Sequence, residues 1–235
     1  MRPVAILRFS ATEGPAYFAQ WLERGRIAAT LVALDAGAAV PTDPRAFAGI
    51  ALMGGPMGVN DALPWLEPVC ALLRESVAQR VPVLGHCLGG QLLAKALGAK
   101  VGRAPAAEIG WIDVEVTAAP AQRDWFGGRS RFTAFQWHYD AFALPAGATP
   151  VLTNAFNPHQ GYIVDDRHIG LQCHVEMTRD LVLTWLAAGA SELPPTSSAF
   201  AQSAADIGNA LPERLAELHA VADDIYARWA QGLVR

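Results

Sequence analysis

A cysteine in a glycine-rich turn is the first candidate for chemistry in this sequence. Cys87 lies in the segment GHCLGG, positions 85–90, between a short apolar run at residues 81–84 and a stretch with apolar residues at helical spacing. Glycines allow the close backbone approaches that such a turn requires. A cysteine at the start of a helix faces unpaired N–H groups and the positive end of the helix dipole. Both favour the thiolate, which is the nucleophilic form.

A histidine and a glutamate two residues apart are the second candidate. On an extended backbone, His174 and Glu176 point to the same side. The carboxylate can then fix the tautomer of the imidazole and stabilise its charged form, so Cys87 with these two residues would supply a nucleophile, a base and an orienting group. Taken alone, a buried cysteine is usually an inert small hydrophobe, and a His-x-Glu pair usually lies on the surface. Cys70 and Cys173 are interpreted as structural.

The elements around these residues predict an α/β fold. Apolar runs expected to be strands alternate with helical patterns up to residue 97, which is typical of βαβ units in a parallel sheet. Ligands of such sheets bind at the carboxyl ends of the strands. Cys87 and a second glycine-rich loop, residues 54–58, both follow such runs, so both should open onto one crevice. The expected strands are residues 4–9, 28–34, 49–53 and 81–84, and the expected helices are residues 16–24 and 65–79.

The second half of the chain has a different pattern. Short strand-like runs should add antiparallel strands to the sheet or beside it; they are residues 109–117, 131–137, 149–153, 160–164 and 169–173. A helix is expected at 180–188, and a long C-terminal helix at 212–233 with an apolar stripe that should pack on the core. We predict one domain over residues 1–190 and a C-terminal loop and helix, residues 191–235, packed on it.

The composition excludes several classes of function. The chain has 235 residues, of which 52% are hydrophobic and 17% charged, so a sizeable packed core is expected. A net charge of −4 without a basic block argues against nucleic acid as a partner. No apolar run reaches the roughly 18 residues of a membrane helix. Three scattered cysteines and no signal-peptide pattern favour the cytoplasm. No spacing among histidines, cysteines and carboxylates indicates a metal site, and no cofactor is expected.

Three motifs resemble those of class I (triad-type) glutamine amidotransferases. GHCLGGQ at 85–91 resembles the family's G-x-C-x-G-x-Q nucleophile motif, and GLQCHVE at 170–176 resembles its G-x-Q-F-H-P-E block. MGGPM at 53–57 is similar to its oxyanion-loop block. The resemblance runs over nearly the whole chain and is strongest to stand-alone members similar to the amidotransferase domain of GMP synthase. Val175 and Cys173 stand where the family has a proline and an aromatic residue.

The resemblance implies a flavodoxin-like fold, with a central, mostly parallel sheet, helices on both faces and a class I amidotransferase domain over residues 1–190. It implies hydrolysis of the γ-carboxamide of glutamine through a thioester on Cys87, with His174 as general base and acid and Glu176 as the orienting carboxylate. The backbone N–H groups of Gly55 and Leu88 would form the oxyanion hole. The glutamine contacts would come from Gln91 and from the backbone around Gln136, Trp137 and His138.

Three readings of the activity stay open. A glutamine-hydrolysing enzyme would deliver ammonia to a separate synthetase subunit, because no synthetase domain is expected within 235 residues. A γ-glutamyl hydrolase acting on γ-glutamyl amines or peptides would use the same triad with a different pocket beyond the scissile bond. A catalytically silent binding subunit of a synthetase is the third reading, and the intact cysteine, histidine and glutamate argue against it. His86, beside the nucleophile, is expected to be a buried, hydrogen-bonded residue or to shape the pocket.

Overall fold

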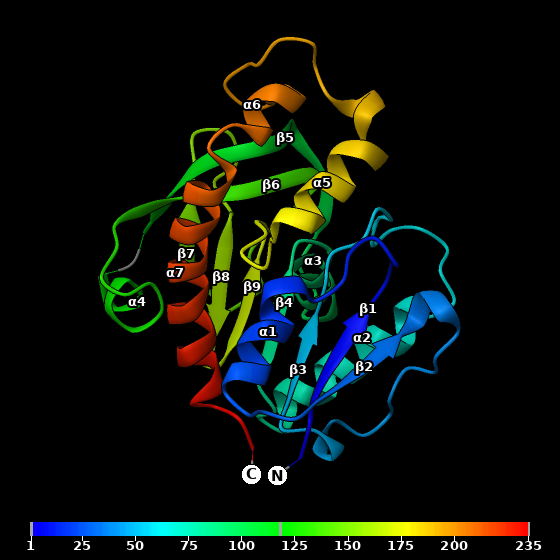
Figure 1. The fold of residues 1–235 in the computed structure, drawn as a ribbon. Coiled ribbons are helices and arrows are strands. Elements are labelled where there is room, and N and C mark those ends of the chain that lie inside the picture. The colour runs from blue at the N-terminus through cyan, green and yellow to red at the C-terminus, as the bar shows by residue number, and fades with distance from the viewer. Residues whose placement is uncertain (1, 118, 235) are drawn as a thin grey trace.

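The computed structural model describes residues 2–117 and 119–234. This part of the chain forms a nine-stranded sheet with the strand order β2-β1-β3-β4-β9-β8-β7-β5-β6 (Figure 1). The strands are β1 (Val4–Arg8), β2 (Ala29–Ala33), β3 (Gly49–Leu52), β4 (Val83–His86), β5 (Val101–Val116), β6 (Arg131–Phe142), β7 (Thr149–Thr153), β8 (Gly161–Val164) and β9 (His168–Leu171).

The first half of this order is a parallel sheet. β2, β1, β3, β4 and β9 pair in parallel, and every residue of β3, β4 and β9 is buried. Strands covered on both faces read as continuous apolar runs, which is why these segments lack the alternation of a half-exposed strand. The predicted α/β fold is therefore confirmed, but the expectation of an antiparallel strand at residues 169–173 is wrong on one side, because β9 pairs in parallel with β4.

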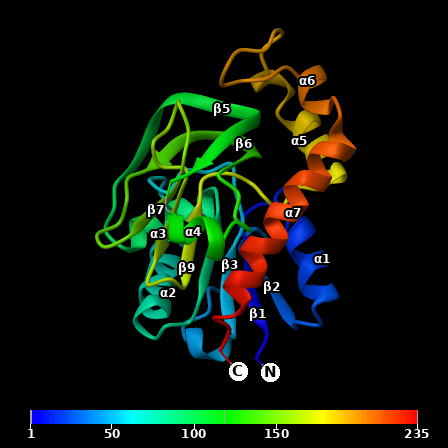
Figure 2. The same ribbon diagram turned by 90° about the vertical axis from the view of Figure 1, so that its left-hand side faces the viewer.

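Helices cover both faces of the parallel strands (Figure 2). α1 (Ala16–Arg24) and α7 (Leu211–Ala230) contribute to the hydrophobic core on one face, whereas α2 (Leu66–Ala78) and α3 (Leu88–Ala96) contribute to the core on the other. This is the flavodoxin-like arrangement that the resemblance implied. The shorter helices are α4 (Ala119–Asp124), α5 (Arg179–Ala188) and α6 (Ala204–Gly208), and the 3₁₀ turns are η1 (Leu34–Ala36), η2 (Pro44–Ala46) and η3 (Ala190–Glu192).

The apolar stripe of the C-terminal helix packs on the core, as predicted. Its members are Leu215, Leu218, Val221, Ile225 and Trp229, all of which are buried. The Phe18 ring of α1 lies 5.8 Å from the Trp229 ring and 4.8 Å from the Tyr226 ring of α7. The division of the chain at residue 190 stays a prediction. Within the described residues, every helix is too short or too polar to cross a membrane.

The antiparallel strands extend the same sheet, and two of them, β5 and β6, are longer than predicted. β5 has 16 residues and β6 has 12, and their pairing is interrupted by a register shift between Arg103 and Glu108. Residues 101–108 were not predicted as strand, because their alanines, proline and charged residues show no alternation of polar and apolar positions. Pairing with the end of β6 holds this segment extended, and that contact is not encoded locally.

Candidate active site

Cys87 stands on a sharp turn between β4 and α3. It is the residue before the first turn of α3, and its backbone adopts φ 46° and ψ −106°, a conformation that residues other than glycine rarely take. A Cβ on Gly89 would lie 2.5 Å from the carbonyl oxygen of Leu52, and one on Gly90 would lie 2.5 Å from that of Leu171. Only glycine therefore lets α3 approach β3 and β9 this closely. The turn is the strand–elbow–helix geometry predicted for a nucleophile.

His174 and Glu176 lie beside Cys87, directly after β9. Nδ1 of His174 donates to Oε1 of Glu176 over 2.6 Å, and its ring also hydrogen-bonds the Cys87 side chain. The backbone N–H of His174 donates to the carbonyl oxygen of Phe135 over 2.8 Å, which anchors this segment to β6. All three side chains are almost completely buried. The structure thus brings together the three residues that the sequence analysis proposed as a triad.

The pKa values of His174 and Glu176 are set by burial and by the charged groups next to them. Burial lowers the pKa of His174, but Glu176 and Cys87 outweigh it and raise that pKa well above its ordinary value. Burial raises the pKa of Glu176, whereas His86 and His174 lower it to about 2. We assign the stabilising charge to His174, because burial outweighs the attraction of Glu176 at His86 and leaves the pKa of His86 below its ordinary value. A charged imidazole held between a carboxylate and the Cys87 side chain is placed to donate a proton to a departing group.

His86 lies behind the triad carboxylate. It is fully buried, with Nε2 3.2 Å from the Tyr226 hydroxyl and 3.7 Å from Oε2 of Glu176. It therefore matches the expectation of a buried, hydrogen-bonded residue. It faces Glu176 and does not line the pocket described next.

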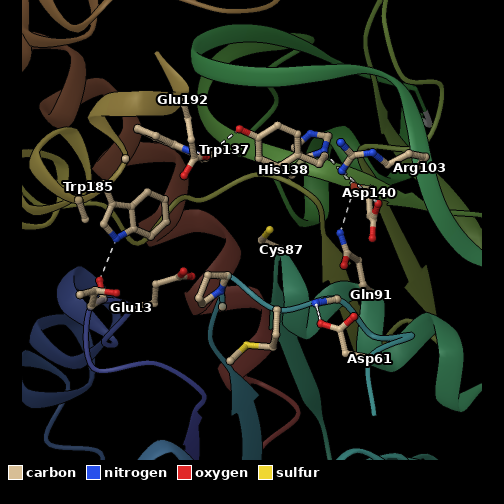
Figure 3. Close-up of a pocket in the computed structure, with 18 residues that line it drawn as sticks. Glu13, Asp61, Cys87, Gln91, Arg103, Trp137, His138, Asp140, Trp185 and Glu192 are labelled. Carbon is tan, nitrogen blue, oxygen red and sulfur yellow. Dashed lines mark hydrogen bonds and ion pairs between the residues drawn. The ribbon is translucent and has the colours of Figure 1, made fainter. Parts of the chain in front are cut away.

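A cavity of about 710 Å³ opens above Cys87 (Figure 3). Of the sequence-predicted residues, Gly55, Gln91, Trp137 and His138 line it together with Cys87. Leu88 adjoins Gly55, since a Cβ on that glycine would lie 2.6 Å from Cδ2 of Leu88. Residues of both glycine-rich loops, 54–58 and 85–90, therefore line one pocket, as expected.

Gln136 is the predicted residue whose side chain turns away from this pocket. It is fully buried, and Nε2 donates to Oε1 of Gln160 over 2.9 Å. Gln91 behaves differently: Nε2 donates to the carbonyl oxygen of Asp140 over 3.1 Å at the pocket wall. Gln172 donates from Nε2 to the Cys87 sulfur over 3.7 Å, a contact that the sequence analysis did not predict.

Several residues of the pocket wall were missed by the sequence analysis. They are Glu13, Arg103, Tyr139, Asp140, Trp185 and Glu192. Glu13 follows the carboxyl end of β1, so the rule that located the Cys87 turn could have found it. Trp185 and Glu192 come from α5 and η3, whose local sequence carries no chemical pattern.

Within the described residues, no group of three or more histidines, cysteines and carboxylates could hold a metal ion.

The carboxyl group of Glu13 lies where burial disfavours its charged form. Burial raises its pKa to about 7, opposed by His174 and reinforced by Glu176. A Cβ on Gly54 would collide with Oε2 of Glu13 and would lie 2.8 Å from Cε1 of His174, so the carboxyl group and the ring face the same glycine. A carboxyl group with so perturbed a pKa in a cleft is a candidate functional residue.

Replacing Glu13 with glutamine is expected to stabilise the protein at pH 8 and to change little at pH 5. Because the pKa of Glu13 is raised on folding, its ionisation destabilises the folded state as the pH rises from about 4.5 to about 7. Glutamine removes this effect, which we put at about 1–2 kcal/mol at pH 8. Urea unfolding of both proteins at the two pH values measures the difference. An equal difference at pH 5 and pH 8 would contradict the prediction.

The chain is similar to glutamine amidotransferases in both sequence and structure. A family model described as glutamine amidotransferase class-I matches residues 19–181. The glutamine amidotransferase-like protein YfeJ of Salmonella typhimurium is 30% identical over 190 residues, covering 77% of this chain and 78% of that protein. A glutamine-hydrolysing GMP synthase of Aeropyrum pernix is 36% identical over 150 residues, covering 61% of this chain and 28% of the synthase. The crystal structure of a glutamine amidotransferase from Methylobacillus flagellatus is 42% identical, with a TM-score of 0.97 over 100% of this chain and 96% of that chain.

Proposed function

Since the chain belongs to the class-I glutamine amidotransferase family, we propose that it hydrolyses the γ-carboxamide of glutamine to glutamate and ammonia through a thioester on Cys87. The observation that supports this most directly is the side-chain cluster of Cys87, His174 and Glu176, in which Cys87 lines the pocket and the other two lie behind it. It supplies a nucleophile, a proton carrier and an orienting carboxylate within contact of one another.

The proposed reaction has two steps. The Cys87 thiolate attacks the γ-carbonyl carbon, and the oxyanion accepts hydrogen bonds from the backbone N–H groups of Gly55 and Leu88. Two such donors stabilise a developing oxyanion by roughly 3 kcal/mol each in comparable sites. The C–N bond breaks as His174 gives its proton to the departing ammonia. Water then attacks the thioester, His174 takes a proton from that water, and glutamate leaves.

Replacing Glu176 with glutamine is expected to weaken hydrolysis without abolishing it. The amide keeps the shape of the side chain but removes the charge that stabilises the protonated His174 ring. We expect kcat to fall by about two to four orders of magnitude, less than for loss of the nucleophile or the base. A steady-state assay of glutamate release measures it, with a melting curve as the control for folding. An unchanged kcat would exclude Glu176 from the mechanism.

The proposed function is tested by labelling and by turnover. The purified chain is incubated with glutamine, and glutamate and ammonia are measured in equal amounts if the proposal holds. In parallel, a diazoketone analogue of glutamine should alkylate Cys87, which peptide mass spectrometry identifies. Absence of both labelling at Cys87 and turnover would support the silent binding subunit, the third open reading of the sequence.

A γ-glutamyl hydrolase is the second candidate function. The cavity of about 710 Å³ lies in the upper range of small-ligand sites and leaves room beyond a bound glutamine. A substrate larger than glutamine fits this volume. If ammonia is instead transferred, a synthetase is the partner that must accept it. Full turnover of γ-glutamyl compounds by the chain alone would show that no synthetase is needed.

A further inference from the structure

The two ends of the pocket carry different charges, with Cys87 between them (Figure 3). At one end, Gln91 donates to the Asp140 backbone, and Nη1 of Arg103 lies 3.8 Å from Oδ1 of Asp140. A cation and an anion side by side suit the α-carboxylate and α-ammonium groups of a glutamyl moiety. The other end holds Glu13 and Trp185. A substrate attacked at its γ-carbonyl therefore places its leaving group toward this second end.

His174 fixes which end receives the leaving group. The residue that protonates the departing nitrogen must lie beside it, and Glu13 and Trp185 both line the pocket next to His174. The ring of Trp185 lies 4.7 Å from the His174 ring at 87°, and its Nε1 donates to the carbonyl oxygen of Thr12 over 2.8 Å. Glu13 faces His174 across Gly54. The indole and the carboxyl group thus form the walls next to the departing nitrogen.

Among the described residues, no side-chain partner explains why the carboxyl group of Glu13 is buried. Across residues 2–117 and 119–234, its carboxyl group makes no hydrogen bond and no ion pair with another side chain. The charged groups that affect it are His174, which the triad occupies, and Glu176, which repels it. A carboxyl group held without a partner at a cavity wall is suited to a ligand that carries a positive charge.

We propose that Glu13 and Trp185 form a subsite for a cationic leaving amine, so that the preferred substrates are γ-glutamyl amides of amines bearing a second, positively charged group. This rests on the proposed thioester chemistry at Cys87 and names its substrate class. Attack by Cys87 breaks the bond between the γ-carbon and the amine nitrogen. His174 protonates that nitrogen, the free diamine leaves, and water releases glutamate from the thioester. The distal ammonium pairs with Glu13 and packs on the indole face.

Three amides of matched length test the charge preference. γ-Glutamyl-putrescine ends in an ammonium, γ-glutamyl-pentylamine in a methyl group at the same position and γ-glutamyl-GABA in a carboxylate. We expect kcat/KM for the ammonium amide to exceed that of the neutral one by about tenfold, and the carboxylate amide to be the poorest. In Glu13→Gln, the ratio of the ammonium amide to the neutral amide should fall to about twofold or less. Asp61→Asn is the matched control, because Asp61 also lines the pocket but does not lie in the wall next to His174. In this variant, the ratio of kcat/KM between the ammonium amide and the neutral amide should equal that of the wild type.

The outcomes separate this inference from the function on which it rests. Equal kcat/KM for the three amides, or an ammonium preference that persists in Glu13→Gln, overturns the cationic subsite. Hydrolysis of glutamine with none of the amides cleaved overturns it as well, while the thioester mechanism stands. If neither glutamine nor any amide is cleaved, the proposed function itself fails. Should Glu13→Gln not fold, the order of the three amides in the wild-type protein decides alone.

Discussion

Replacing Cys87 with serine is expected to abolish turnover while leaving the fold intact. A serine hydroxyl is not ionised by this site and is a far weaker nucleophile than a thiolate, so kcat should fall by about five to six orders of magnitude. The two side chains have the same shape, and a serine hydroxyl can keep the contacts that the Cys87 side chain makes with His174 and with Nε2 of Gln172. The melting temperature should therefore stay close to that of the wild type. Glutamate release and thermal unfolding of the same preparation measure both quantities.

The other two cysteines provide the control for this experiment. Cys70 and Cys173 are fully buried, and burial raises the pKa of both thiols. Neither should react with a diazoketone analogue of glutamine, and Cys70→Ser should keep wild-type turnover. Labelling of Cys70 or Cys173 in place of Cys87 would refute the assignment of the nucleophile. Retention of more than a tenth of the turnover in Cys87→Ser would do the same.

The turn that bears Cys87 was predictable because its signals are local. An apolar run, glycines and a helical pattern follow one another within 17 residues, and each glycine has a distinct contact to explain it. The departures from the family motif are also explained locally. Cys173 and Val175 are completely buried in the hydrophobic core, so their side chains serve packing, while His174 between them reaches the opposite way, to Cys87.

The meeting of the two motifs depends on a contact that no local pattern encodes. In the parallel pairing of β4 and β9, Gly85 is in register with Gly170 and His86 with Leu171. The N–H of Cys87 then donates to the carbonyl oxygen of Leu171 over 2.9 Å. The insertion of β9 beside β4 thus aligns the nucleophile motif with the histidine motif. From the sequence, the late strands were expected to be antiparallel, in the sheet or beside it. Their exact place could not be predicted, because strand pairing at this separation is set by tertiary packing.

The leaving-group end of the pocket was beyond sequence reasoning for the same reason. Glu13 comes from the loop after β1, and Trp185 comes from α5, 172 positions later in the chain. The indole donates to the backbone of Thr12, which joins these two segments. Neither residue belongs to a sequence motif, and the role proposed for them depends on their position next to the His174 ring in the folded chain. The family motifs indicate how the amide bond is cleaved. Which leaving amine is preferred depends on pocket residues such as Glu13 and Trp185, which lie outside those motifs.

Replacing His174 with alanine is expected to reduce turnover by about five orders of magnitude and also to destabilise the fold. Without the ring, no group in the cluster can receive a proton from Cys87 or deliver one to the leaving nitrogen. The Glu176 carboxylate is then buried without its cation, a loss that is worth about 3–5 kcal/mol for buried ion pairs. Because the pKa of His174 is raised on folding, its stabilising effect is present in full below pH 6.5 and fades as the pH rises through the raised value. The gap in unfolding free energy between wild type and variant should therefore be widest below pH 6.5 and should narrow as the pH rises through the raised pKa.

The double variant His174→Ala/Glu176→Gln separates the two effects of this substitution. A neutral amide has no charge to bury unpaired, so the double variant should be more stable than His174→Ala although it is equally inactive. Urea unfolding of the two variants at pH 6 compares their stability, and glutamate release compares their turnover. Equal stability of the single and double variants would mean that Glu176 is not held ionised by His174. Wild-type hydrolysis in His174→Ala would remove this histidine from the mechanism altogether.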